Sequence, residues 1–274
     1  MRKFTLSDDF ASFYQKEGYL VVSDAFNAPE LAAIQADIFD LFESRFRDIN
    51  PAGLRGIDLL AHYHTENRPA WQQCARRMYD LLGIYRLACK PQVLEIVSKL
   101  GLRKAMISTR PEVRTDMPHD EQYTQGWHQD WRYGQGSLNS VTFWVPLHDV
   151  GEEQGTVAVM PGTHTMGYLA CDELLNPRRF VIPDEAIAGR PSFPVELKKG
   201  DALVFSQMLV HRSGYNRSGR PRLTTQIRFV DYAERRFVDQ GLPSPVSSDL
   251  LWDPTPSAAD LAAIFPGAAP PAQD

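Results

Sequence analysis

The segment Arg222-Leu-Thr-Thr-Gln-Ile-Arg228 alternates polar and apolar side chains with a period of two. This is the period of a β-strand with one buried face, because successive side chains of a strand point to opposite faces of the sheet. Arg222, Thr224, Gln226 and Arg228 therefore share one face.

Short apolar or alternating runs of the same kind occur from about residue 103 onward, separated by Gly, Pro, Asn and Asp. They are residues 105–108, 141–145, 156–160, 202–205 and 223–230. Many short strands between turn residues are typical of an antiparallel sandwich or barrel. Strands and helices do not alternate along the chain, so we predict one β-core over about 103–232 rather than a parallel sheet.

The sequence before this core, from about residue 6 to 101, indicates helices. Ser7 is expected to cap a short helix that ends at Gly18, followed by a strand over residues 19–22 and a second helix from near Asn27. The whole pattern predicts a mostly-β fold with flanking α-helices. We expect a single domain over residues 1–241, whose N-terminal helices buttress the β-core, and a Pro/Ala-rich tail over 242–274.

Chemistry is first indicated by His128-Gln129-Asp130. If this segment is a strand, the imidazole and the carboxylate project from the same face. Such a pair is common by chance and needs a third ligand. Among the seven histidines, His211 follows the run Gly200–Phe205, which is typical of a turn and a buried strand leading to it. Two histidines and one carboxylate would leave three adjacent positions open on an iron(II) ion, as oxygenases need.

A second indication is Arg222, which lies eleven residues beyond His211 at the start of the alternating strand. A guanidinium group inside a barrel needs an anionic partner, because a buried unpaired charge is costly. The distal carboxylate of 2-oxoglutarate could supply that partner in bidentate geometry, and Thr224 could add a hydroxyl donor.

Taken in order, these segments resemble the phytanoyl-CoA dioxygenase family of 2-oxoglutarate-dependent oxygenases. The resemblance runs from about residue 106 to 230. It rests on the following motifs: Trp127-His128-Gln129-Asp130, Trp144-Val145-Pro146-Leu147, Gly155-Thr156, Met160-Pro161-Gly162-Thr163-His164, Lys199-Gly200-Asp201-Ala202-Leu203-Val204-Phe205, His211-Arg212-Ser213-Gly214 and Arg222.

The resemblance implies a double-stranded β-helix, that is, a jelly-roll or cupin-like barrel. It also implies iron(II), 2-oxoglutarate and dioxygen, with hydroxylation coupled to release of succinate and carbon dioxide. Position by position, it implies that His128, Asp130 and His211 bind the metal and that Arg222 binds the distal carboxylate. Four further positions match residues that line the cosubstrate pocket, namely Met106, Gln129, Trp144 and Ser213. Halogenating relatives replace the metal carboxylate, so Asp130 favours hydroxylation.

Polar residues around the metal motif suggest the substrate class. Candidate contacts before it are Arg110, Arg114 and Asp116, and those after it are Trp131, Arg132, Tyr133, Gln135 and Asn139, with Arg228 on the alternating strand. Their charge and hydrogen-bonding capacity suit a small polar or anionic molecule. Gly134–Gly136 is consistent with a flexible lid.

Composition excludes other classes of partner. With 29 basic and 34 acidic residues the formal net charge is −5, so a nucleic-acid surface is not expected. No stretch of 18 or more apolar residues occurs, so no membrane span is expected. The three cysteines form no CxxC pair, which favours free thiols in a reducing cytoplasm. The oligomeric state is left open.

Two other functions compete with the oxygenase. A non-redox cupin-like enzyme, such as a sugar isomerase or epimerase, could use a similar barrel, but it has no need for Arg222 to hold a keto acid. An inactive ligand-binding relative would be expected to lack a metal ligand or the arginine, and this sequence has all four residues.

Overall fold

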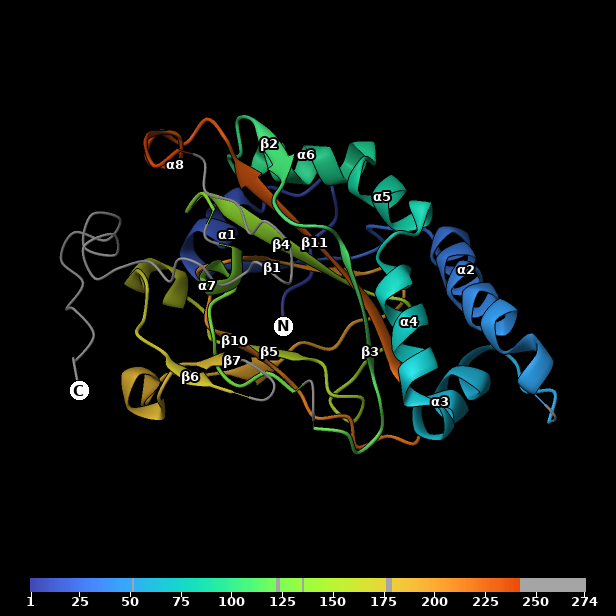
Figure 1. Cartoon of the computed structure of the whole chain (residues 1–274). Coiled ribbons are helices and arrows are strands. Elements are labelled where there is room, and N and C mark those ends of the chain that lie inside the picture. The colour runs from blue at the N-terminus through green and yellow to red at the C-terminus, as the bar shows by residue number, and fades with distance from the viewer. Residues whose placement is uncertain (51, 122–123, 135, 176–178, 242–274) are drawn as a thin grey trace.

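The computed structural model describes residues 1–50, 52–121, 124–134, 136–175 and 179–241. A six-stranded antiparallel sheet forms its centre (Figure 1). Its spatial order is β1 (Tyr19–Val22), β9 (Ala202–Ser206), β4 (Ser140–Pro146), β11 (Arg222–Asp231) and β2 (Ala105–Ile107), and β3 (Glu112–Asp116) also pairs with β11. β11 pairs with β4 along one edge, and with β3 and then β2 along the other.

A smaller antiparallel sheet has the order β10 (His211–Ser213), β5 (Val157–Val159), β8 (Phe193–Pro194). β6 (Asp172–Leu174) and β7 (Arg179–Val181) form a separate two-stranded ribbon. One isolated antiparallel bridge, between His128 and His211, adds the metal motif to the edge of the small sheet next to β10.

Helices make up most of the N-terminal part. They are α1 (Ala11–Glu17), α2 (Ala28–Phe46), α3 (Gly56–Glu66), α4 (Arg68–Met78), α5 (Leu82–Ala88) and α6 (Pro91–Lys99). The 3-10 turn η1 (Arg47–Ile49) follows α2 directly. Short helices also occur later in the chain: α7 (Trp131–Gly134), α8 (Arg235–Asp239) and the 3-10 turns η2 (Thr163–Met166) and η3 (Asp184–Ile187). No helix in the described part of the chain is long and apolar enough to cross a membrane.

Alternation along the strands divides the core into two layers. In β1, Leu20 and Val22 join the buried cluster that includes α2–α6, whereas Tyr19 and Val21 join a second cluster with Val157 and other residues of the small sheet. Helices therefore cover one face of the large sheet, and the small sheet faces the other. The polar face of β11 lies on the side of the small sheet, because Leu223 and Ile227 pack with the helices.

Most of the predicted element boundaries are confirmed. Gly18 ends α1 in the left-handed conformation with φ 78°, and the Asn27 side chain accepts a hydrogen bond from the Glu30 amide at the start of α2. The predicted Ser7 cap is wrong, because α1 begins at Ala11 after Phe10 without a side-chain cap. Asp8 instead accepts hydrogen bonds from Thr5.

The predicted class is confirmed as antiparallel β-sheets with flanking helices. The predicted limits of the β-core are too narrow, because β1 pairs with β9 and joins the large sheet from the N-terminal part. The predicted tail over 242–274 lies outside the described residues.

Candidate metal centre

The sequence suggests that the metal motif lies on a strand. In the structure it does not. His128 makes a single two-way bridge with His211: each backbone amide donates to the other residue's carbonyl, at 3.0 and 3.1 Å. The chain then turns, and the Tyr133 and Gly134 amides of α7 donate to the Asp130 carbonyl. The tight turn still brings His128 and Asp130 to the same side.

The three predicted metal ligands converge. One ligand atom from each of His128, Asp130 and His211 lies within 4.8 Å of the other two. Asp130 Oδ1 is 3.5 Å from His128 Nε2 and 3.6 Å from His211 Nε2. All three side chains are buried, and these spacings fit three donors around one divalent ion.

Hydrogen bonds prepare both imidazoles for this role. His128 Nδ1 lies 2.7 Å from the Gly126 carbonyl and His211 Nδ1 lies 2.9 Å from the Leu209 carbonyl. A carbonyl can only accept, so Nδ1 carries the proton and Nε2 keeps its lone pair for a metal. Burial lowers the pKa of His128 to about 4, so its ring is neutral at pH 7.

The second oxygen of Asp130 is fixed by the large sheet. Oδ2 accepts hydrogen bonds from the Thr142 hydroxyl and from Arg228 Nε, each at 3.0 Å. Burial alone would raise the pKa of Asp130, but the cation Arg228 holds it well below its usual range. The carboxylate therefore presents a single ionised oxygen, Oδ1, to the two histidines.

Arg222 is buried on the same face of β11. Its Nη2 and Nε lie 2.7 and 3.2 Å from Asp116 Oδ2, and its guanidinium carbon is 5.9 Å from the centre of the Trp144 ring. Burial alone would raise the pKa of Asp116, but Arg114 and Arg222 hold it below its usual range. The expected anionic partner of Arg222 is thus a carboxylate of the chain itself, and the tryptophan predicted for the cosubstrate pocket stands beside it.

The other predicted cosubstrate residues differ in their burial and in their contacts. Thr224 is fully buried, and its hydroxyl has no hydrogen-bond partner among the residues that the structure describes. Ser213 lies within 3.3 Å of Arg114 Nη1. Met106 pairs with Val230 near the end of the same face and is 42% exposed.

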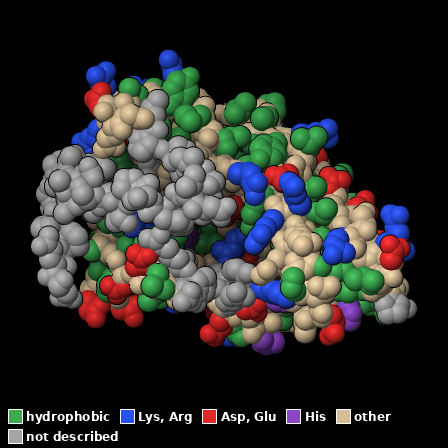
Figure 2. All heavy atoms as spheres, viewed as in Figure 1, with side chains coloured by type: hydrophobic (Ala, Val, Ile, Leu, Met, Phe, Trp, Pro, Cys, Tyr) green, Lys and Arg blue, Asp and Glu red, His purple; other side chains and the backbone are tan. Residues whose placement is uncertain are grey.

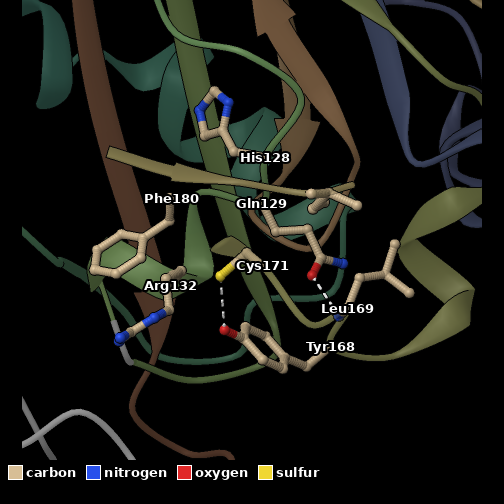
Figure 3. A pocket seen from close by; sticks show the side chains of 8 residues that line it. His128, Gln129, Arg132, Tyr168, Leu169, Cys171 and Phe180 are labelled. Carbon is tan, nitrogen blue, oxygen red and sulfur yellow. Dashed lines mark hydrogen bonds between the residues drawn. The ribbon is translucent and has the colours of Figure 1, made fainter. Parts of the chain in front are cut away.

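Gln129 is turned away from the metal ligands. Its amide donates to the carbonyls of Gly167 and Met208 and accepts from the Leu169 amide. Figure 3 shows it extending toward Leu169 while His128 points the other way. Gln129 therefore holds the segment after η2 in place.

A narrow pocket lies behind His128, lined also by Arg132, Tyr168, Cys171 and Phe180 (Figure 3). The Arg132 guanidinium stacks 4.1 Å from the centre of the Phe180 ring. Of the predicted substrate residues, Arg132 lines this pocket directly.

Tyr133 lies next to the metal ligands, with its ring edge-on to His128 at 5.9 Å between ring centres. Its hydroxyl accepts hydrogen bonds from Gln125 and from the Phe180 amide. Burial raises the pKa of Tyr133 to about 12, so the hydroxyl keeps its proton at neutral pH.

Several candidate substrate contacts have other positions. Arg110 pairs with Asp80 at the surface at 3.1 Å. Figure 2 shows Lys and Arg side chains gathered over α4 and β3. Arg228 binds Asp130, and Asn139 donates to Gly101 and Asp231. Arg114 and Asp116 belong to β3 beside Arg222, and Trp131 is buried. Gln135 lies outside the described residues.

The sequence interpretation missed two contacts of the site. Thr142, which holds the metal carboxylate, had not been considered, although it is two residues from Trp144 and so shares its face of β4. The pairing of Asp116 with Arg222 depends on the β3–β11 register, which is a non-local property.

The sequence profile of the phytanoyl-CoA dioxygenase family matches residues 14–224. The chain belongs to the phytanoyl-CoA dioxygenase family. This confirms the resemblance drawn from the motifs. An uncharacterised Mycobacterium tuberculosis protein is 24% identical over 242 residues, covering 81% of this chain and 74% of its own length.

Solved structures agree on the fold of this phytanoyl-CoA dioxygenase family member. The non-haem α-ketoglutarate-dependent epimerase SnoN of nogalamycin biosynthesis aligns over 81% of this chain and 79% of its own, with 21% identity and a TM-score of 0.56. EctD of S. alaskensis, crystallised with 2-oxoglutarate and 5-hydroxyectoine, aligns over 84% of this chain and 77% of its own, with 18% identity and a TM-score of 0.56.

Proposed function

We propose that the protein is an iron(II)- and 2-oxoglutarate-dependent oxygenase that hydroxylates a small polar organic substrate. One C–H bond of the substrate becomes C–OH, one oxygen atom of dioxygen enters that hydroxyl, and the other enters succinate as 2-oxoglutarate loses carbon dioxide. The observation that carries this proposal is the buried convergence of His128 Nε2, Asp130 Oδ1 and His211 Nε2.

Iron(II), when bound, supplies dioxygen activation and an anchor for the keto acid. The chain supplies the orientation. Backbone carbonyls fix the tautomer of both histidines, while Thr142 and Arg228 hold one oxygen of Asp130 so that the other faces the metal. This rigid set of partners would keep the remaining coordination positions on one side.

Arg222 and Thr224 are the residues we assign to the distal carboxylate of 2-oxoglutarate. Arg222 offers fixed charge and planar donors, and Thr224 offers a buried hydroxyl without a partner. Trp144 would form the apolar wall beside them. These residues lie on the face of the large sheet that meets the small sheet, as do the residues that hold Asp130.

The strand pairing supports a jelly-roll arrangement for residues 103–232. β3, β11, β4 and β9 are neighbours in the large sheet, and the His128 bridge, β10, β5 and β8 are neighbours in the small one. We propose that these two sets of four are the two layers of a double-stranded β-helix. The domain over residues 1–241 is proposed on the same ground.

The substrate class is proposed from the side chains near the metal. The buried Arg132 lines the pocket, and the half-buried Tyr133 packs against the ligand His128; both offer polar groups. The similarity to EctD, whose structure contains 5-hydroxyectoine, is consistent with a small polar substrate.

An anaerobic titration tests the proposed class. Addition of 2-oxoglutarate to the iron(II) protein is expected to produce a weak visible charge-transfer band, and His211→Ala should produce none. A screen of polar metabolites for stimulated succinate release would then find the substrate. A non-redox cupin-like enzyme or an inactive relative predicts no band, so its absence would remove the proposal.

An epimerase is the second candidate, because SnoN is an α-ketoglutarate-dependent epimerase with a similar fold. The two reactions differ in the fate of oxygen. A hydroxylase incorporates one atom of ¹⁸O₂ into the product, whereas an epimerase inverts a stereocentre and leaves the substrate mass unchanged. Mass spectrometry of the product under ¹⁸O₂ separates the two.

A further inference from the structure

Two charged residues of β3, Arg114 and Asp116, lie inside the site and have no role in the proposed function so far. In the β3–β11 register, Asp116 is opposite Arg222 and Arg114 is opposite Thr224. Directly opposite residues of an antiparallel pair share a face, so all four point between the two sheets. Asp116 is 9% and Arg222 1% exposed, which makes any charge imbalance here expensive.

Asp116 divides its two oxygens between two guanidinium groups. Oδ2 is 2.7 Å from Arg222 Nη2 and 3.2 Å from Arg222 Nε. Oδ1 is 2.7 Å from Arg114 Nη2. One carboxylate therefore serves two permanent cations, and the trio has a net charge of +1.

The donors that Asp116 does not use are directed elsewhere. Within the part of the chain that the structure describes, Arg222 Nη1 has only a long contact, 3.5 Å to the Gln154 carbonyl. Because Asp116 occupies the Nε–Nη2 edge of Arg222, the Nη1 side of that guanidinium stays available for a second carboxylate.

Arg114 reaches across to the small sheet. Its Nη1 lies 3.3 Å from the hydroxyl of Ser213, which is two residues beyond the metal ligand His211 on β10. Arg114 therefore lies between the strand that supplies a metal ligand and the strand that supplies Arg222. The unpartnered hydroxyl of Thr224 is its direct neighbour across the β3–β11 pair.

We propose that Arg114 is a second binding residue for the distal carboxylate of 2-oxoglutarate, and that Asp116 positions both guanidinium groups for it. The inference rests on the proposed function. One distal carboxylate neutralises the net charge of the Arg114–Asp116–Arg222 trio. The trio therefore selects keto acids that have a second carboxylate over those that have none.

Equilibrium binding to the anaerobic iron(II) protein tests this inference without any primary substrate. The charge-transfer band is titrated with 2-oxoglutarate and, separately, with 2-oxobutyrate, a keto acid without a distal carboxylate. Arg114→Gln should weaken 2-oxoglutarate at least tenfold, as expected for a lost charge-assisted contact. Its affinity for 2-oxobutyrate should stay within twofold of the wild type. Arg114→Lys should lie between, because it keeps the charge without the planar fork.

Arg217→Ala is the matched control, since this exposed arginine on the β10–β11 connection packs on Tyr215 and its loss removes one positive charge outside the site. It should bind both keto acids as the wild type does. Melting curves show whether each variant is folded. If Arg114→Gln is unfolded, the comparison of the two keto acids is made with Arg114→Lys instead.

Each other result overturns the inference. If Arg114→Gln binds 2-oxoglutarate normally, the distal carboxylate does not use Arg114. If the variant weakens both keto acids equally, Arg114 acts through the metal or the fold. If the wild type gives no band with either keto acid, the proposed function fails and the inference fails with it.

Discussion

At the scale of single residues, the metal carboxylate depends on a contact that carries no charge. The Thr142 hydroxyl donates to Asp130 Oδ2 at 3.0 Å from the large sheet. Thr142→Val keeps the shape and removes only this donor, so Asp130 should rotate more freely. Losing such a partner typically costs 10–100-fold in metal affinity; we expect about tenfold, measured by titration with cobalt(II) under anaerobic conditions.

Thr115→Val is the control for that substitution. Thr115 is a buried threonine of β3 without a hydrogen-bond partner, and its register partner Leu223 packs with the helices. The same chemical change there should leave cobalt affinity unaltered. Equal losses in the two variants would mean that the Thr142 contact does not orient Asp130.

Arg222 and Arg228 share a face of β11 but have different partners. Arg222 binds Asp116, whereas Arg228 binds the metal ligand Asp130. Arg222→Ala should weaken 2-oxoglutarate by roughly 30-fold or more, because truncating one partner of a buried charge pair costs on the order of 2–5 kcal/mol. Lysine should restore only part of this.

For Arg228 we expect an effect on the metal rather than on 2-oxoglutarate. Arg228→Ala should weaken metal binding, because Arg228 Nε holds Asp130 Oδ2. Separate titrations with cobalt(II) and with 2-oxoglutarate distinguish the two arginines. If Arg228→Ala abolished 2-oxoglutarate binding with metal affinity intact, and Arg222→Ala had no effect, the assignment of Arg222 would be wrong.

At the scale of elements, α3 and α4 pack through a histidine that is not part of the metal centre. His64 of α3 lies edge-on to Trp71 of α4, with 4.7 Å between ring centres. Burial, and then Arg68, lowers the pKa of His64 to about 4, although Asp120 acts in the opposite direction. The folded state therefore keeps His64 neutral under conditions where the unfolded chain protonates it.

The sign of the pH effect follows from proton binding. Between pH 6.5 and about 4 the unfolded chain binds more protons at His64 than the folded one, so the free energy of unfolding falls as pH falls. His64→Phe removes this contribution and should make the melting temperature less sensitive to pH over that interval. His62→Gln, exposed on the same helix, is the matched control. An unchanged slope in His64→Phe would contradict the assignment.

The length of each element decided whether the sequence pattern could predict it. The alternation over 222–228 identified β11 and its polar face correctly, because a strand of ten residues repeats its pattern several times. The metal motif was placed on a strand, yet His128 contributes a single bridge and α7 begins at Trp131. A one-residue bridge has no period, so no pattern could reveal it.

Non-local pairing was the other limit. The short run Tyr19–Val22 was expected as a strand, but nothing in it indicates that it pairs with β9. In the same way, the sequence indicated Asp116 only as a candidate substrate contact, and the β3–β11 register places it opposite Arg222. Local patterns predicted which segments form strands, whereas the pairings of β1 with β9 and of β3 with β11, and with them the second half of the site, depend on contacts more than a hundred residues apart in the chain.

At the scale of the whole molecule, the candidate site joins the two sheets. His128 and His211 belong to the edge of the small sheet, while Thr142 and Arg228 hold Asp130 from the large one. A divalent ion bound by His128, Asp130 and His211 would therefore link the layers, and 2-oxoglutarate reaching Arg222 would add a second link.

Ligands that bind only the folded state should thus raise its stability. At a hundred times the dissociation constant the gain is about 2.7 kcal/mol, which for a domain of this size corresponds to a rise of about 5–10 °C in melting temperature. Nickel(II), which avoids turnover, should produce this rise over a sample treated with EDTA, and 2-oxoglutarate should increase it only when the metal is present. His211→Ala should lose both effects, because it lacks one of the two imidazole nitrogens that face Asp130 Oδ1. If the variant showed the same increases as the wild type, metal and keto acid would be binding elsewhere on the molecule, and the site between the sheets could not be the metal centre.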